Sequence, residues 1–247
     1  MFSEPVLRFR AEDGDDVPFL LWRTTRPLRA VSTAPLGGGL GVRHWVLNAT
    51  VPMSYRRDDP DAHLAELAGD LGLSGPGVGH LTGVDVAELV VRSDDGVRVW
   101  ATVGLGAPVW AAAPAGPVVD PAGPADQVDP VGPAGVDAGH PVGTVNIVAL
   151  LPVGLSDAAL VNAVGTVTEA KAQALWDLGL PATGTATDAV TVLCPTEEPA
   201  ERYGGPRSRW GAPLARAVHR AVRDGGAVVR PAWSDRVGPT APGPTAL

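Results

Sequence analysis

A strand–helix–strand pattern in the C-terminal half of the chain constrains its fold most strongly. Thr144–Leu151 is a nearly continuous apolar run, which is typical of a strand covered on both faces. Ser156 can cap a long helix that ends near Leu178, where Gly179 provides a stop. Ala189–Leu193 then predicts a second strand. A long helix between two apolar strands indicates a sheet with at least one face covered by helices.

The other elements predicted from hydrophobic spacing are mostly short strands. The expected strands are Val6–Arg10, Phe19–Trp22, Arg29–Thr33, His44–Val51 and a hairpin of Asp85–Arg92 with Val97–Val103, and the expected helices are Asp61–Leu71 and Ala212–Arg223. The N-terminal part of the chain is thus rich in strands, and the C-terminal part has the order β-α-β-α. This order predicts an α/β or α+β fold, a single-domain sandwich of mixed β-sheet with covering helices.

Two segments have a composition that cannot pack a core. Residues 114–141 hold 7 Pro, 5 Gly and 4 Asp and no basic residue, which predicts a flexible surface insertion. Residues 231–247 are similar in composition and predict a disordered tail. The remaining residues, 1–230, are expected to form one domain.

The acidic balance of the chain limits its partners. With 19 basic and 27 acidic side chains and a net charge of −8, it lacks the basic stripe expected of a nucleic-acid or anionic-membrane binder. No secretory signal and no uninterrupted span of ~20 apolar residues is apparent. The single cysteine, Cys194, fits a reducing compartment, so a cytoplasmic protein is expected. General frequency alone favours a homodimer.

Lys171 is the single lysine, against 18 arginines. At 100° per residue it joins one apolar stripe of the predicted long helix, made of Leu160, Val164, Val167, Lys171, Leu175 and Leu178. A buried ammonium needs a partner or a depressed pKa, which makes Lys171 a candidate site residue. The alternative is that its stem packs while the amine reaches water. Glu169 lies on the opposite, polar side of the helix, where a solvated residue is expected.

A glycine-rich segment, Ser32–Gly41, is the first candidate binding element. Its consecutive glycines allow backbone N–H groups to approach an anion or a carbonyl oxygen, although a simple turn between strands gives the same pattern. His44 and Asn48 follow on one face of a predicted strand, so imidazole and amide can meet one cavity.

Asp188 begins the last predicted strand, after the small residues Ala182–Thr187. A carboxylate beside backbone N–H groups can orient a base, accept a proton or bind a metal, and turn formation is the alternative. The histidines show no HxH or HExxH spacing, so no metal site is expected. A G-x-S-x-G nucleophile elbow is also absent.

Seven short motifs in order resemble the adenosylcobinamide amidohydrolases of corrinoid salvage. They are STAPLGGGLG (32–41), HWVLNATVP (44–52), LTGVDV (81–86), VGLGAP (103–108), GTVNIV (143–148), TEAKAQAL (168–175) and ATGTATDAV (182–190). Two features depart from the family pattern. The insertion follows VGLGAP, and Arg207 and Ser208 stand where family members often carry His and Thr.

The resemblance implies hydrolysis of the amide that joins aminopropanol to the corrin ring of adenosylcobinamide. The products would be adenosylcobyric acid, which can re-enter cobamide synthesis, and 1-aminopropan-2-ol. The partner is therefore a corrinoid small molecule. Its cobalt belongs to the substrate, so no cofactor is expected of the protein itself.

The motifs together with the helix geometry suggest roles for individual residues. The expected catalytic residues are Lys171, Asp188, His44, Asn146 and Glu169, and the expected substrate-binding residues are Ser32, Gly37, Gly38, Gly39, Gly41, Asn48 and Thr185. The glycine backbone would bind the oxyanion, Asp188 or His44 would activate water, and Asn146 would orient the amide. Lys171 would stabilise the oxyanion or protonate the amine.

Two alternatives stay open at this point. A side-chain nucleophile, Ser32, Thr33 or Thr185, would give an acyl-enzyme. A corrinoid-binding protein without catalysis would use the glycine segment and the tryptophans for binding alone.

Overall fold

The structure is a computed structural model that describes residues 2–12, 14–113, 143–197, 200–228 and 233. Within these ranges the chain forms an eight-stranded mixed sheet and three α-helices, which confirms the predicted single-domain α+β class. The predicted insertion, 114–141, lies outside the described residues. The predicted tail also lies outside them, except for Trp233. The Trp233 side chain is buried, and its backbone amide donates to the Gly83 carbonyl.

The element bounds are as follows. The strands are β1 (Val6–Glu12), β2 (Asp15–Ser32), β3 (Gly39–Thr50), β4 (Val78–Thr82), β5 (Val90–Asp94), β6 (Val97–Val103), β7 (Val145–Leu150) and β8 (Ala189–Cys194), and the helices are α1 (Pro60–Asp70), the 3₁₀ helix η1 (Val86–Glu88), α2 (Asp157–Asp177) and α3 (Gly211–Gly226).

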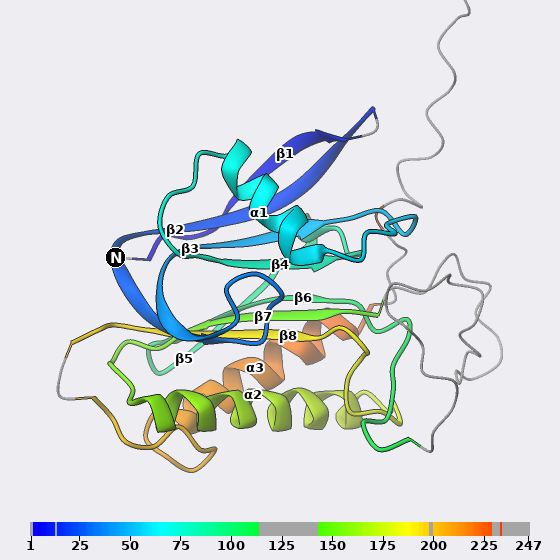
Figure 1. The fold of residues 1–247 in the computed structure, drawn as a ribbon. Coiled ribbons are helices and arrows are strands. Elements are labelled where there is room, and N and C mark those ends of the chain that lie inside the picture. Colours follow the sequence, from blue (N-terminus) through cyan, green and yellow to red (C-terminus); the bar gives the residue numbers. More distant parts are fainter. Residues whose placement is uncertain (1, 13, 114–142, 198–199, 229–232, 234–247) are drawn as a thin grey trace, which may run out of the picture.

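The sheet order is β4-β3-β2-β8-β7-β6-β5, with β1 paired to β2 outside this path. Two pairs of neighbouring strands are parallel: β3 with β4, which α1 connects, and β7 with β8, which α2 connects. The remaining pairs are antiparallel. The predicted strand–helix–strand unit is therefore the β7–α2–β8 crossover (Figure 1).

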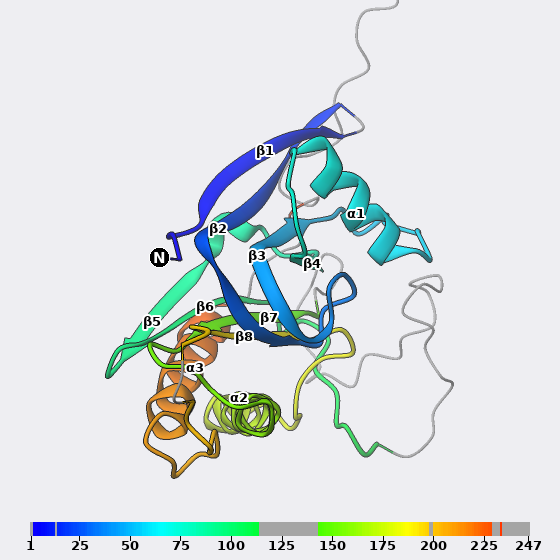
Figure 2. The same cartoon turned by 60° about the vertical axis from the view of Figure 1, so that its left-hand side comes forward.

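A bend in β2 folds the sheet over itself. The β2–β3 register shifts between Arg23 and Leu28, and only the part of β2 after this shift pairs with β8. The strands before the bend thus face β6 and β7 across a shared apolar core (Figures 1 and 2). Trp22 and Trp100 meet there edge to face, with ring centroids 6.1 Å apart.

Helices cover both outer faces of this folded sheet. α2 and α3 pack against the β5–β8 part through the largest apolar cluster, and α1 covers the outer side of β2 and β3 (Figure 2). The result is the expected sandwich with covering helices. Among the described residues, no helix is long and apolar enough to cross a membrane.

Most predicted elements are present, with three differences. Arg29–Thr33 is not a separate strand, because it continues β2 through the bend. Asp85–Arg92 is only partly a strand: the Asp85 side chain caps η1, and β5 begins at Val90. β4 was not predicted, because a glycine and a histidine interrupt the apolar residues of its sequence, VGHLT.

Candidate active site

Lys171 and Asp188 form a buried ion pair at the junction of α2 and β8. The predicted apolar stripe of α2 does face the core, and Lys171 within it is only 6% exposed. Its Nζ donates to Oδ2 of Asp188, the residue just before β8. The ammonium is therefore paired within the protein instead of reaching water along its stem.

Four donors of the protein surround the Asp188 carboxylate. Oδ1 accepts hydrogen bonds from the Val145 amide at 2.8 Å and from the Thr185 hydroxyl at 2.5 Å. Oδ2 accepts from Lys171 and from the Thr185 amide at 3.0 Å. A carboxylate offers about four acceptor positions, so these donors fill it. Asp188 is fixed in place and holds the Lys171 ammonium toward the segment that carries Thr185.

Gly184 lies directly against this ion pair. A Cβ built on Gly184 would stand 2.4 Å from Lys171 Nζ and 2.5 Å from Asp188 Oδ2, so only glycine fits without displacing the pair. The same glycine connects the pair to the segment after β6, because its carbonyl accepts from the Val109 amide at 2.8 Å. The Thr183 amide donates back to the Val109 carbonyl at 3.0 Å.

Exposed apolar side chains lie beside the ion pair. The segment that follows β6 runs next to the segment that follows α2, at the C-terminal end of that helix (Figures 1 and 2). On it, Val109 is 40% and Trp110 46% exposed. The Ala111 amide donates to the Thr183 hydroxyl at 2.9 Å, which ties this segment to the residues around Gly184. A buried charge and an exposed apolar rim therefore adjoin.

A second group of polar side chains lies buried between the two halves of the sheet. We call it the interior polar cluster, and its members are Ser32, Asn48, His80, Thr102, Asn146 and Thr191. The Thr191 hydroxyl links two of them, since its Oγ1 is 2.8 Å from Ser32 Oγ and 2.8 Å from His80 Nε2. Each of the three comes from a different strand, so the cluster joins β2, β4 and β8.

The amide groups of the cluster extend it to β3, β6 and β7. Asn146 Nδ2 donates to Asn48 Oδ1 at 3.0 Å and to the Leu81 carbonyl at 2.9 Å. Asn48 Nδ2 donates in turn to Thr102 Oγ1 at 3.1 Å. The structure therefore places Asn146 and Asn48 together, on the inner side of the sheet, whereas Lys171 approaches from the α2 side.

Three members of the cluster, Thr102, Thr191 and His80, were not predicted from the sequence, and His80 is the titratable one. It is fully buried, and burial lowers its pKa to about 4. Its Nδ1 and the Oδ1 of Asn146 have no hydrogen-bond partner among the described residues. The available signal was its position immediately before the LTGVDV motif, but its facing partner, Asn48, lies on a strand that only the fold brings alongside.

The glycine-rich segment closes onto β4. The Gly37 carbonyl accepts from Arg43 Nη2 at 2.7 Å, and the Gly79 amide donates to the Leu36 carbonyl at 3.0 Å. Gly37 has a φ of +70°, and a Cβ there would be 1.9 Å from the Gly77 carbonyl oxygen. Glycine is thus required here by the approach of the protein's own backbone, and the segment begins at Ser32, a member of the interior polar cluster.

Two predicted catalytic residues lie apart from both groups. His44 is half-buried, with its ring against Gly75, and stands four positions before Asn48 on β3, a separation of about 13 Å along a strand. Glu169 is exposed on the outer side of α2, where helix geometry placed it. The structure brings neither residue to the Lys171–Asp188 pair.

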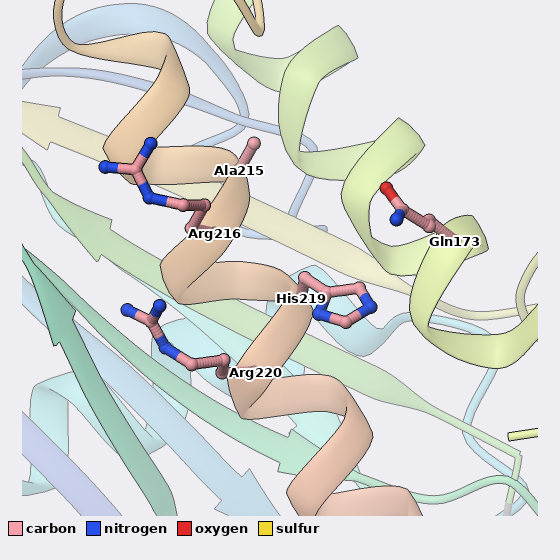
Figure 3. Close-up of a pocket in the computed structure, with 5 residues that line it drawn as sticks. All are labelled: Gln173, Ala215, Arg216, His219 and Arg220. Atoms are coloured by element: carbon pink, nitrogen blue, oxygen red, sulfur yellow. The ribbon is translucent and has the colours of Figure 1, made fainter. Parts of the chain in front are cut away.

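A hollow of about 190 Å³ lies elsewhere, between α2 and α3 (Figure 3). Its lining residues are Gln173, Ala215, Arg216, His219 and Arg220. The two arginines share Asp94 and the histidine contacts Asp177, so each of these side chains already has an acidic partner. Among the residues that the structure describes, no group of three or more His, Cys, Asp or Glu could hold a metal ion.

Comparison with known proteins gives a consistent result. The family model described as adenosylcobinamide amidohydrolase matches residues 5–230. A Methanosarcina mazei protein named adenosylcobinamide amidohydrolase is 28% identical over 205 residues, which are 79% of this chain and 88% of that protein. A protein of the same name from Halobacterium salinarum is 39% identical over 145 residues, 58% of this chain and 55% of that protein.

Proposed function

The chain belongs to the adenosylcobinamide amidohydrolase family, and we propose that it cleaves adenosylcobinamide into adenosylcobyric acid and 1-aminopropan-2-ol. The observation that carries this proposal is the buried Lys171–Asp188 pair, which lies within two of the motifs that the family resemblance rests on. A corrinoid acid with a free carboxylate is then available for renewed amide formation, so the reaction serves corrinoid salvage.

Lys171 supplies the proton that amide cleavage needs. An amine leaves an acyl carbon only when its nitrogen is protonated, and the tetrahedral intermediate carries a negative oxygen. The ammonium of Lys171 can serve either need, because its contact with Asp188 holds it in place. Asp188 holds Lys171 in place, and its filled acceptor positions argue against the expectation that it activates a free water molecule.

The corrin ring is held outside the ion pair. A corrinoid offers wide apolar surfaces with amide side chains at its edge, which suits an exposed apolar rim beside a buried charge. Val109 and Trp110 provide such a rim, and the glycine-rich segment is the second expected contact. The ring rests on the rim while the aminopropanol amide reaches Lys171.

The departure from the family pattern at Arg207 does not favour a binder without activity. Arg207 is exposed on the loop before α3, and Ser208 accepts from the Gly211 amide at 3.0 Å and so helps to begin that helix. The loop rests on the first half of α2 through Gly204. It lies at the other end of α2 from the segment that carries Thr185 (Figure 1).

The test is incubation of the purified protein with adenosylcobinamide, followed by chromatography and mass spectrometry of the corrinoid. We expect adenosylcobyric acid and 1-aminopropan-2-ol in equal amounts. Unchanged adenosylcobinamide in the presence of folded protein would contradict the proposal. Tight binding in that case, measured by calorimetry, would identify a corrinoid-binding protein instead.

A further inference from the structure

We propose that Thr185 is the nucleophile of this hydrolase and forms an ester with the corrinoid acid before water releases it. The inference rests on the proposed function, because it concerns how the same amide is cleaved. It selects one of the three hydroxyl groups that the sequence left open.

The argument begins with the donors around Asp188. Oδ1 receives the Val145 amide and the Thr185 hydroxyl, and Oδ2 receives the Thr185 amide and Lys171. A water molecule activated by this carboxylate would have to displace one of them. Two of the four are backbone amides and one is an ammonium, so among the described residues Thr185 Oγ1 is the single nucleophilic oxygen in contact with the base.

The two other hydroxyl groups have weaker support. Thr33 Oγ1 accepts from the Val190 amide at 2.9 Å, a contact that supplies no base. Ser32 Oγ reaches His80 only through Thr191, and the lowered pKa of that buried imidazole makes it a poor proton acceptor. The Thr185 hydroxyl contacts the Asp188 carboxylate, which can take its proton, and the Lys171 ammonium contacts the same carboxylate.

Thr185 also lies where a substrate amide can reach it. Thr185 itself is 9% exposed, and the two residues that follow it, Ala186 and Thr187, are exposed. Gly184, the residue next to Thr185, presents no side chain and lies directly against the ion pair. The aminopropanol amide can approach Thr185 and Lys171 together from this side.

The steps balance as follows. Thr185 Oγ1 attacks the amide carbon as its proton passes to Asp188, and Lys171 gives a proton to the nitrogen as the C–N bond breaks. 1-Aminopropan-2-ol leaves, and the corrinoid acyl group remains as an ester on Thr185. Water then attacks the ester and gives one proton to neutral Lys171, while Asp188 returns its proton to Thr185 Oγ1. The net reaction is amide plus water to acid plus amine.

The experiment first uses the unmodified enzyme. Adenosylcobinamide is mixed with excess protein, the reaction is quenched in acid within milliseconds to seconds, and the intact mass and tryptic peptides are measured. A parallel reaction contains hydroxylamine, with a control that lacks enzyme. We expect a mass increase equal to the corrinoid acyl group on the peptide with Thr185, or, if the ester is too short-lived, a corrinoid hydroxamate formed only with enzyme.

Variants then separate the nucleophile from a structural role. Thr185→Val keeps the shape of the side chain but removes the hydroxyl, and we expect turnover to fall by ~10³-fold or more. Thr185→Ser restores the hydroxyl, and we expect it to recover measurable turnover and the same adduct. The matched control is Thr168→Val, because Thr168 is exposed and its hydroxyl donates to the Val164 carbonyl of its own helix.

Several results would overturn the inference while leaving the hydrolase function intact. They are an adduct on Ser32, turnover without either adduct or hydroxamate, and a folded Thr185→Val protein that keeps its activity. Failure of the unmodified enzyme to cleave adenosylcobinamide at all is a different result, which would overturn the proposed function itself.

Discussion

Asp188 contacts Lys171 across the junction of a strand and a helix, and both side chains of the pair are less than one-tenth exposed. Removal of one partner leaves the other charge buried. We therefore expect Lys171→Met to abolish turnover and to lower the free energy of unfolding by about 3 kcal/mol. Urea unfolding and the corrinoid assay measure the two effects.

A second substitution separates stability from chemistry in this pair. Lys171→Met combined with Asp188→Asn removes both charges, so we expect most of the lost stability to return while turnover stays absent. A double variant that regains activity would show that Lys171 takes no part in the reaction.

The close approach of Gly184 gives a prediction with a matched control. Gly184→Ala places a methyl group against Lys171 Nζ and Asp188 Oδ2, so we expect turnover to fall by ~100-fold or more through displacement of the pair. Gly165→Ala is the same change on α2, where a Cβ meets nothing within 4 Å. There we expect unchanged activity and a gain of ~0.5–1 kcal/mol in stability. Equal kinetics for both variants would contradict the geometry.

Steady-state kinetics can test the apolar rim. Trp110→Ala should raise KM for adenosylcobinamide about tenfold with little change in kcat, because the lost contact binds the ring in the ground and transition states alike. Trp176→Ala is the control, since this tryptophan is 69% exposed on the outer side of α2. If the two substitutions change KM equally, the ring does not rest on Trp110.

Burial of His80 predicts a pH dependence of stability. Its pKa is lowered to about 4 in the folded protein, while the unfolded imidazole takes up a proton below a pH of about 6.5. Stability should therefore be unaffected above this pH and fall by up to about 3 kcal/mol as the pH drops toward 4. The side chains around His80, Thr191 and Asn146, are neutral, and burial lowers the His80 pKa by more than Asn146 raises it.

The measurement for His80 is urea unfolding at pH 7.5 and pH 4.5. The pKa of His63 is also lowered by burial, so the pH effect in the wild type is compared with that in His80→Gln. We expect the variant to lose clearly less stability between the two pH values. An equal loss of stability in both proteins would mean that the neutral state of buried His80 does not cause the pH dependence.

Local pattern predicted the parts of the site that depend on one element at a time. The spacing of apolar residues along α2 was enough to predict that Lys171 is buried, because an α-helix has 3.6 residues per turn whatever packs against it. Asp188 and Thr185 were candidates, but their meeting with Lys171 depends on how the segment after α2 returns to the sheet. No pattern in the sequence predicts the path of that segment.

Contacts between distant segments explain what could not be predicted. His80 meets Thr191 across 111 positions of the chain, and β4 pairs with β3 only after α1 has crossed. The bend of β2 likewise lies between the part that pairs with β1 and the part that pairs with β8, while β3 pairs with both parts. Such features follow from the packing of the whole sheet and leave no periodic trace in their own residues.

The central place of β8, between β2 and β7, also bears on how the protein is made. Ser32 and Thr191 are 159 positions apart, so β2 leaves the ribosome long before its neighbour does. Until then β2 and β7 each present an open edge of the kind that recruits other chains. The late strand seals both edges and delivers Asp188 in the same event. Truncated products that lack it are thus expected to be inactive and prone to aggregate, while every chain that closes its sheet also completes its ion pair.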